Sequence, residues 1–408
     1  MRAASWSIFA AVSFGSASLY AAWTAAPLIA IELTGSRAAG GTPGAAALLG
    51  TAAGSAILSA VMARRGRRSG LRLGYTLGLV GAVTAVAAAA RSLFLPFLLA
   101  MLLIGVGHSA NQLSRFAVSD LHAGERKASA LSWIVWAGTI GAVLGPSLLR
   151  AGEPIADGLA LPGLTGSFLF ALLLFGCALA CVTLVTPDLS TIAVDDTVES
   201  QPVQSVSSLG SKWRRPHVRL ALVVMVMGQV AMILVMTMTP LHVREHGHGL
   251  VAVGAVMTSH FVGMFALAPA IGRFVGRRGA LPAIFVGLPV LALGSAAAAL
   301  SPPSSGVLLG ASLLVVGLGW SFGFIAGSAL LTHGMTYVER VRLQGSVDAV
   351  VWSASAVASV TSGILLSTWG FVVLCLLAAA LVLVPVVVTA IRRPTVESSL
   401  DRRTPQPR

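Results

Sequence analysis

The ten residues Ser59-Ala-Val-Met-Ala63-Arg64-Arg65-Gly66-Arg67-Arg68 stand at the junction of two apolar runs, residues 43–63 and 71–90. A second basic turn, Gly272-Arg-Phe-Val-Gly276-Arg277-Arg278-Gly279, follows a similar run at 250–274. Each run is close to the length of about 20 apolar residues that a helix needs to cross a bilayer. Both turns therefore indicate membrane-spanning helices joined by short basic loops.

Reading outward from these turns, the same kind of run recurs along the chain. We predict an all-α membrane protein with twelve transmembrane helices, at residues 5–31, 43–63, 71–90, 93–117, 128–149, 164–186, 216–239, 250–274, 280–300, 305–331, 345–367 and 369–391. The last two are separated only by Ser367-Thr368-Trp369-Gly370, which we interpret as a turn.

Composition supports a membrane protein and argues against other classes. The 408 residues are 56% hydrophobic and 10% charged, whereas soluble domains carry about 25% charged residues. The net charge of +13 does not indicate nucleic-acid binding, because the basic residues lie in short clusters between apolar runs and no recognition motif accompanies them. The three cysteines lie in apolar runs and show no metal-ligand spacing.

The basic residues predict the orientation. With the N-terminus in the cytoplasm, 23 of the 27 Lys and Arg residues fall on the cytoplasmic side. The positive-inside rule therefore places both termini in the cytoplasm of a multi-pass protein. Only two of these 27 residues are Lys, a bias typical of GC-rich bacterial genomes, so we expect the bacterial plasma (inner) membrane.

The polar stretch between the sixth and seventh runs divides the chain. We expect an N-terminal six-helix bundle at 1–186, a flexible cytoplasmic linker at 187–215, a C-terminal six-helix bundle at 216–391 and an unstructured cytoplasmic tail at 392–408. The basic turns at Gly66 and Gly279 are 213 residues apart, and Trp136 and Trp352 are 216 apart. Such shared spacing indicates two parallel repeats, and transporters of this construction bind substrate near the midplane between them.

The chain resembles the major facilitator superfamily over nearly its whole length, and the two basic turns carry the clearest motif of this resemblance. The family's loop between helices 2 and 3 reads Gly-x-x-x-Asp-Arg-x-Gly-Arg-Arg, and the residues that match it here are Arg64, Gly66, Arg67 and Arg68. The matching residues of the second half are Gly272, Arg277 and Gly279. The resemblance implies a gating role for these residues, while positive-inside anchoring explains the arginines equally well. The family's acid is replaced by Ala63 and Gly276, which puts its usual gate ion pair in doubt.

The fifth run contains a partial match to the helix 5 motif of drug exporters in the family, at Gly141, Gly145 and Pro146. Glycines four residues apart also allow two helices to approach closely. Because the match is partial, the motif favours export only modestly. Close packing of two helices is the alternative explanation of its glycines. The stretches around Gly319, Trp320 and Asp348 also resemble those of a poorly characterised bacterial group of the family. This second resemblance does not indicate a substrate.

Polar residues inside apolar runs are costly and mark candidate sites. The resemblance implies that helices 1, 4, 7 and 10 line a central cavity, and stripes of polar or aromatic residues fall on these runs. As candidate substrate-cavity residues we take Tyr20, His108, Asn111, Gln112, Trp136, Gln229 and Trp320. Each has an alternative role in packing, and His108 has the alternative of a neutral ring bonded to Gln112.

The sequence predicts a secondary transporter that moves a small, neutral or amphipathic organic molecule by alternating access. Export is the first choice and uptake the alternative, and a non-transporting receptor is the second class. An enzyme is not expected, because no acids, nucleophiles or metal ligands cluster at one depth. No cofactor, catalytic residue or metal site is expected, and His242, His246 and His248 are interpreted as a solvated loop. The expected partners are the substrate, the lipid bilayer and, from the resemblance, a coupling proton with His108 as its candidate carrier.

Overall fold

A computed structural model describes residues 2–120, 126–185, 215–302, 304–331, 333 and 337–401; within these ranges, side chains are not described for 2–5, 63, 115–120, 126–135, 185, 337–342, 344–345 and 392–401. The expected linker at 187–215 lies almost wholly outside these ranges. The elements are α1 (Arg2–Thr34), η1 (Arg37–Gly41), α2 (Thr42–Arg65), α3 (Arg67–Ala90), α4 (Phe94–Asp120), α5 (Arg126–Gly158), η2 (Gly163–Thr165), α6 (Gly166–Ala180), η3 (Cys181–Val185), α8 (Pro216–Glu245), α9 (Leu250–Phe265), α10 (Ala268–Arg278), α11 (Ala280–Leu300), α12 (Gly306–Leu331) and α13 (Tyr337–Asp401).

Helices occupy all twelve expected ranges, and the fold is the all-α membrane architecture that the sequence predicts. Among the described residues, ten segments are long and apolar enough to cross a membrane, and the last, Ser346–Ile391, includes two helices. They meet at Gly370, whose φ of 81° is not helical, so the expected turn before the twelfth run is confirmed.

Two details differ from the expectation. The eighth run is broken at Ala266 and Leu267, which separate α9 from α10 ahead of Pro269, because proline cannot donate the backbone hydrogen bond that would continue the helix. Helix α13 continues to Asp401, so the expectation of an unstructured tail is wrong for residues 392–401.

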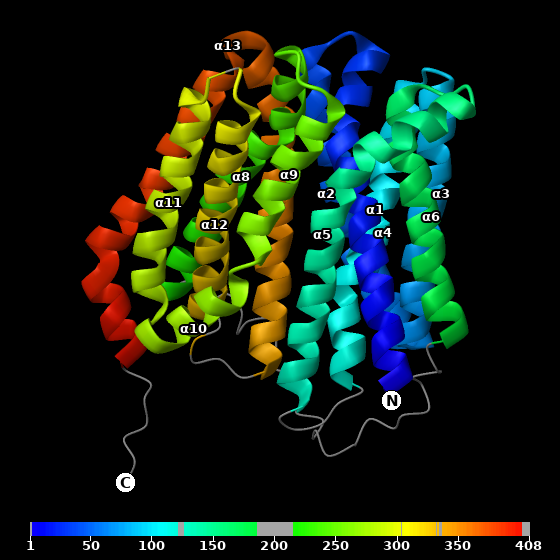
Figure 1. Ribbon diagram of the computed structural model, residues 1–408. Helices are drawn as coiled ribbons and strands as arrows, with labels where there is room; N and C mark the ends of the chain where they lie inside the picture. Colours follow the sequence, from blue (N-terminus) through cyan, green and yellow to red (C-terminus); the bar gives the residue numbers. More distant parts are fainter. Residues whose placement is uncertain are drawn as a thin grey trace.

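The helices run side by side and form two groups (Figure 1). Helices α1 to α6 contact one another, as do α8 to α13. The start of α1 and the end of α13 lie at the same end of the bundle (Figure 1), which we call the proximal end. The opposite end, where α1 meets η1 and α8 meets α9, is called the distal end.

The two groups meet through a small set of elements. Helix α5 contacts α9, α13 contacts α2 and η1, and α1 contacts α8 and α9. Buried apolar side chains from both groups form a shared core, with Phe97, Phe168, Phe175 and Phe261 among its largest fully buried members, and a second core cluster lies within the C-terminal group. This packing fixes α1, α4, α8 and α12, the helices that carry most of the candidate residues.

Candidate functional site

Four candidate residues lie halfway along four different helices. Tyr20, His108, Gln229 and Trp320 are each within two residues of the midpoints of α1, α4, α8 and α12. At 1.5 Å per residue this is about 3 Å along the axis. The four helices carry no Asp, Glu, Lys or Arg within seven residues of their midpoints, so these helices are electrically neutral at this level apart from any charge on His108.

In the N-terminal group, Asn111 connects three helices. The Tyr75 hydroxyl donates a hydrogen bond to Asn111 Oδ1 at 2.8 Å, and Asn111 Nδ2 donates to Ser16 Oγ at 3.3 Å. Asn111 is only 6% exposed. These bonds link α3, α4 and α1 and engage both ends of the amide, so Asn111 has a structural partner on each side.

Tyr75 is a residue that sequence reasoning missed. It is one of only three tyrosines in the chain, and it stands in the predicted span at 71–90. A buried tyrosine usually has a partner for its hydroxyl. That rule could have singled out Tyr75, although not its partner.

His108 and Gln112 lie one turn apart on α4, with His108 Nε2 and Gln112 Nε2 3.4 Å apart. This is the pairing that the packing alternative predicts for His108. The other ring nitrogen, Nδ1, is buried and has no hydrogen-bond partner among the described residues. The His108 ring packs edge-on against Tyr20, with centroids 6.3 Å apart.

In the C-terminal group, Trp320 is held on three sides. Its indole N–H donates to Gln229 Oε1 at 2.7 Å, which ties α12 to α8. Its ring stacks on Phe324 with centroids 4.9 Å apart and an interplanar angle of 19°, and it meets the edge of Phe265 at 6.3 Å. Gln229 is 3% exposed, so the bond is sheltered. The spacing of Trp320 and Phe324, four residues on one helix, was a signal for this stacking.

The two groups touch at this level through one aromatic pair. Tyr20 of α1 and Phe261 of α9 have ring centroids 4.4 Å apart. His108, Tyr20 and Phe261 therefore form a continuous row of rings that crosses from one group to the other. The structure thus brings together Tyr20 with His108 in the N-terminal group, and Trp320 with Gln229 in the C-terminal group.

Trp136 does not join these clusters. Its side chain on α5 is 52% exposed. The three motif residues that follow it lie against other helices. A Cβ added at Gly141 would lie 2.3 Å from the Ser13 carbonyl oxygen, and one at Gly145 would lie 2.8 Å from that of Ala17. The glycines therefore let α5 approach α1 closely, and the carbonyl oxygen of Pro146 lies opposite Gly254 of α9.

The two basic turns at the proximal end have equivalent backbones. Gly66 joins α2 to α3 and Gly279 joins α10 to α11, each with a positive φ. Arg64 and Arg277 are exposed, and Gly272 has no atom near the position of a side chain. Arg68 instead donates to the carbonyl oxygens of Val182 and Thr183 at the end of the sixth helix. This contact lies within the N-terminal group and satisfies carbonyls that a helix end leaves unpaired.

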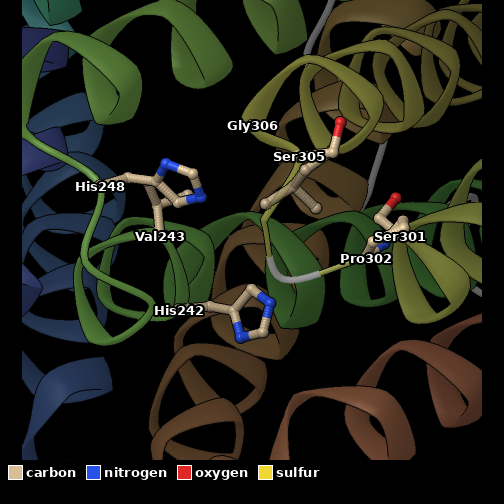
Figure 2. Close-up of a pocket in the computed structure, with 8 residues that line it drawn as sticks. His242, Val243, His248, Ser301, Pro302, Ser305 and Gly306 are labelled. Carbon is tan, nitrogen blue, oxygen red and sulfur yellow. The ribbon is translucent and has the colours of Figure 1, made fainter.

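Two histidines near the end of α8 and the start of α9 line a small pocket at the distal end (Figure 2). His242 and His248 line one side of it, and Ser301 and Ser305 of the α11–α12 connection line the other. The His242 ring stacks on Phe371, with centroids 3.9 Å apart. Within the described part of the chain, no three His, Cys, Asp or Glu side chains are placed to hold a metal ion.

Comparisons with known proteins agree with this architecture. The sequence profile of the Major Facilitator Superfamily matches residues 8–347. An uncharacterized MFS-type transporter of Bacillus subtilis (strain 168), YdeG, is 33% identical over 382 residues, which is 92% of this chain and 89% of that protein. The riboflavin transporter RfnT of Brucella anthropi is 33% identical over 319 residues, covering 76% of this chain and 77% of that one.

Solved structures show the same fold at lower identity. The nucleoside transporter NupG superposes with a TM-score of 0.68 at 16% identity, covering 94% of this chain and 98% of that one. The xylose transporter XylE from E. coli, in a partially occluded inward open conformation, superposes with a TM-score of 0.68 at 14% identity, covering 95% and 97%.

Proposed function

The chain belongs to the major facilitator superfamily, and from this premise we propose that it is a secondary transporter for a small, uncharged organic molecule with a flat ring system. Membership of the family makes it a multi-pass membrane transporter. We propose its substrate class, its direction of transport and its binding site. The observation that carries it is the pair of neutral aromatic and amide clusters halfway along α1 and α4 and along α8 and α12.

The absence of fixed charge supports an uncharged substrate. No Asp, Glu, Lys or Arg lies within seven residues of the four midpoints, about 10 Å along each axis. An ion held at this depth without a counter-charge would lose its hydration and gain no compensating pair. A neutral molecule needs only hydrogen bonds and apolar contact there.

The side chains at this level support a flat ring system. Trp320 of the C-terminal group and Tyr20 of the N-terminal group place aromatic rings at this level, and aromatic rings attract one another in stacked and edge-to-face arrangements. The 33% identity with a riboflavin transporter points the same way, because the isoalloxazine ring of riboflavin is flat and uncharged. Riboflavin is therefore the first substrate to test.

Orientation and direction complete the proposal. We place both termini in the cytoplasm of a bacterial plasma membrane, because 23 of the 27 Lys and Arg residues then lie on that side. We propose export, on the partial helix 5 motif at Gly141, Gly145 and Pro146. Close packing against α1 is a second reason for both glycines, and uptake is the alternative that the assay distinguishes. A coupling proton would use His108, whose ring can gain a charge at this level.

Flux through purified protein in liposomes tests the proposal. Riboflavin should cross in a saturable, protein-dependent manner, and Trp320→Ala should lower the flux at least about tenfold, the loss expected when a stacking residue is removed. Trp369→Ala is the matched control, because this tryptophan is 62% exposed at the distal end of the bundle.

Two results would contradict the proposal, and a further measurement decides the direction and the coupling. Flux of an organic anion or cation with no flux of flat neutral solutes would exclude the substrate class. Binding of riboflavin without flux would favour the receptor alternative. Liposomes loaded from inside or outside, with and without a pH gradient, separate export from uptake and show whether a proton is coupled.

A further inference from the structure

The distal end of α8 carries two histidines four residues apart, His242 and His246. Residues at this spacing lie one turn apart on the same face of a helix. The two rings are accordingly close, with centroids 4.3 Å apart and an interplanar angle of 57°. The same spacing brings together the two zinc-binding imidazoles of the His-Glu-x-x-His motif of metalloproteases. The two rings are therefore spaced as a pair of nitrogen ligands.

The ring of His246 is oriented by a hydrogen bond that suits a metal ligand. His246 Nδ1 lies 2.8 Å from the His242 carbonyl oxygen. Because a carbonyl oxygen only accepts, Nδ1 carries the proton, and the lone pair of the neutral ring is on Nε2. Histidines that bind metals usually donate their other ring N–H to a carbonyl or carboxylate group in this way. His246 is exposed, so an ion from solution can reach its ring.

The ring of His242 is fixed by stacking. It lies on the ring of Phe371, with centroids 3.9 Å apart and an interplanar angle of 10°. Stacking engages the face of an imidazole, whereas both of its nitrogens lie on the edge. The contact therefore restricts rotation of the ring and leaves the edge for other partners. Figure 2 shows His242 at the pocket beside the α11–α12 connection.

The backbone at this end of α8 is also held. The Gly247 amide donates to the Arg244 carbonyl oxygen at 3.0 Å, and the His248 amide donates to that of Val243 at 3.3 Å. Gly247 has a φ of 80°. Together these features form a Schellman motif with His246 at the C-cap. The motif keeps the last turn of α8 from unwinding, so an ion would meet two imidazoles that are already close, at a lower entropy cost.

The charges beside the histidine pair balance one another. Arg37 Nε lies 2.7 Å from Glu245 Oε1, and Glu32 and Arg244 attract each other electrostatically. These two acids and two bases sum to no net charge, so they do not repel a cation. Within the part of the chain that the structure describes, no third His, Cys, Asp or Glu completes a metal-binding group. The protein would therefore supply two nitrogens, and water would fill the other positions.

We propose that His242 and His246 form a surface site for a divalent transition-metal ion, held by two imidazole nitrogens and water. Imidazole suits Zn²⁺, Ni²⁺ and Cu²⁺, and Cu²⁺ should bind more tightly than the other two. Mg²⁺ and Ca²⁺ prefer oxygen ligands and should not bind. His242 lies thirteen residues beyond Gln229 on α8, about 20 Å along the axis. The metal site is thus separate from the proposed substrate site, and its test needs no substrate.

Metal titration of the purified protein, freed of any histidine affinity tag, tests the site. Zn²⁺ should bind in a saturable manner and raise the melting temperature, because an ion that binds only the folded state stabilises it. The paramagnetic resonance spectrum of bound Cu²⁺ should show splitting from nitrogen ligands. Mg²⁺ at the same concentration is the control ion and should not change the melting temperature.

The variant His246→Asn separates a metal ligand from a structural residue. The asparagine amide nitrogen stands where Nδ1 stands, so it can keep the hydrogen bond to the His242 carbonyl oxygen, but asparagine has no counterpart of Nε2. This variant should keep the melting temperature of the metal-free protein. It should weaken Zn²⁺ binding by at least about tenfold, the lower range of loss when a ligand shell is disturbed.

Two further variants complete the design. His242→Ala removes the other nitrogen ligand and should also weaken Zn²⁺ binding, although the loss of stacking on Phe371 should lower stability. His248→Ala is the matched control, because this neighbouring histidine lies outside the four-residue spacing. It should leave the Zn²⁺ affinity unchanged.

The outcomes are distinct from those of the flux assay. Unchanged Zn²⁺ affinity in His246→Asn would overturn the metal site, as would a Cu²⁺ spectrum without nitrogen splitting. An equal loss of affinity in His248→Ala would overturn the assignment to His242 and His246. If His242→Ala is too unstable to purify, His246→Asn decides the question alone. If Zn²⁺ binds as expected while no flat neutral molecule is carried, the metal site stands and only the proposed substrate fails.

Discussion

Gly66 and Gly279, 213 residues apart in the chain, adopt nearly the same backbone conformation, with φ and ψ of 84° and 161° in one and 88° and 169° in the other. Each glycine ends one helix and begins the next. Their amides donate to the carbonyl oxygens of Met62 and Val275, at 3.0 and 2.9 Å. The internal repeat that the sequence indicates is thus present in the backbone at its two clearest landmarks.

Replacing either turn glycine should destabilise the protein. A conformation with positive φ and ψ near 170° is open almost only to glycine, and holding another residue there costs about 1–3 kcal/mol. Gly66→Ala and Gly279→Ala should therefore each lower the melting temperature in detergent. Gly276→Ala, three residues earlier in a helix with open space around it, is the control and should not.

Two glycines of α5 offer a matched pair. The Cβ of Gly141→Ala would meet the Ser13 carbonyl oxygen at 2.3 Å, whereas that of Gly138→Ala would have only Ser16 Oγ, at 3.7 Å. The first change should lower thermal stability by about 1–3 kcal/mol through overpacking. The second should leave it equal or raise it by up to about 1 kcal/mol, because alanine favours helix. Equal effects of the two changes would mean that α5 and α1 are not in close contact.

The bond between Trp320 and Gln229 should appear as coupling between the two side chains. Trp320→Phe and Gln229→Met each break the 2.7 Å hydrogen bond. The double variant should cost less than the sum of the two single variants, by about 1 kcal/mol in unfolding free energy. Thermal unfolding of all four proteins closes the cycle. Strict additivity would show that the two residues do not interact.

Tyr75→Phe should destabilise the N-terminal group. The change removes the donor to Asn111 Oδ1 and leaves a buried acceptor unsatisfied, at a cost of about 1–3 kcal/mol. Tyr20→Phe deletes the same hydroxyl from a ring that is held by its contact with Phe261, so it should cost less. A larger loss of stability for Tyr20→Phe would contradict this assignment of roles.

The sequence was sufficient for the helices and for the family. Hydrophobicity acts along the chain, since each span must be apolar over its own length whatever surrounds it. The twelve ranges, the turn at Gly370 and the glycine turns could therefore be located without knowing any contact. The break between α9 and α10 was missed because one apolar run covers both helices, and Pro269 alone did not mark where the helix would stop.

What the tertiary structure decided is the pairing of residues. Asn111 and Gln112 adjoin on α4 and are equally polar, yet one bonds to α3 and α1 and the other lies beside His108. Trp320 and Gln229 are 91 residues apart, and Ser359 and Gly41 are 318 apart. These contacts depend on how each helix is rotated and how closely its neighbours approach, and both are set by side-chain packing across the whole bundle. The order of residues along one helix carries no record of which face meets which neighbour, so only the assembled fold reveals the contact of Ser359 with Gly41 and the two aromatic clusters.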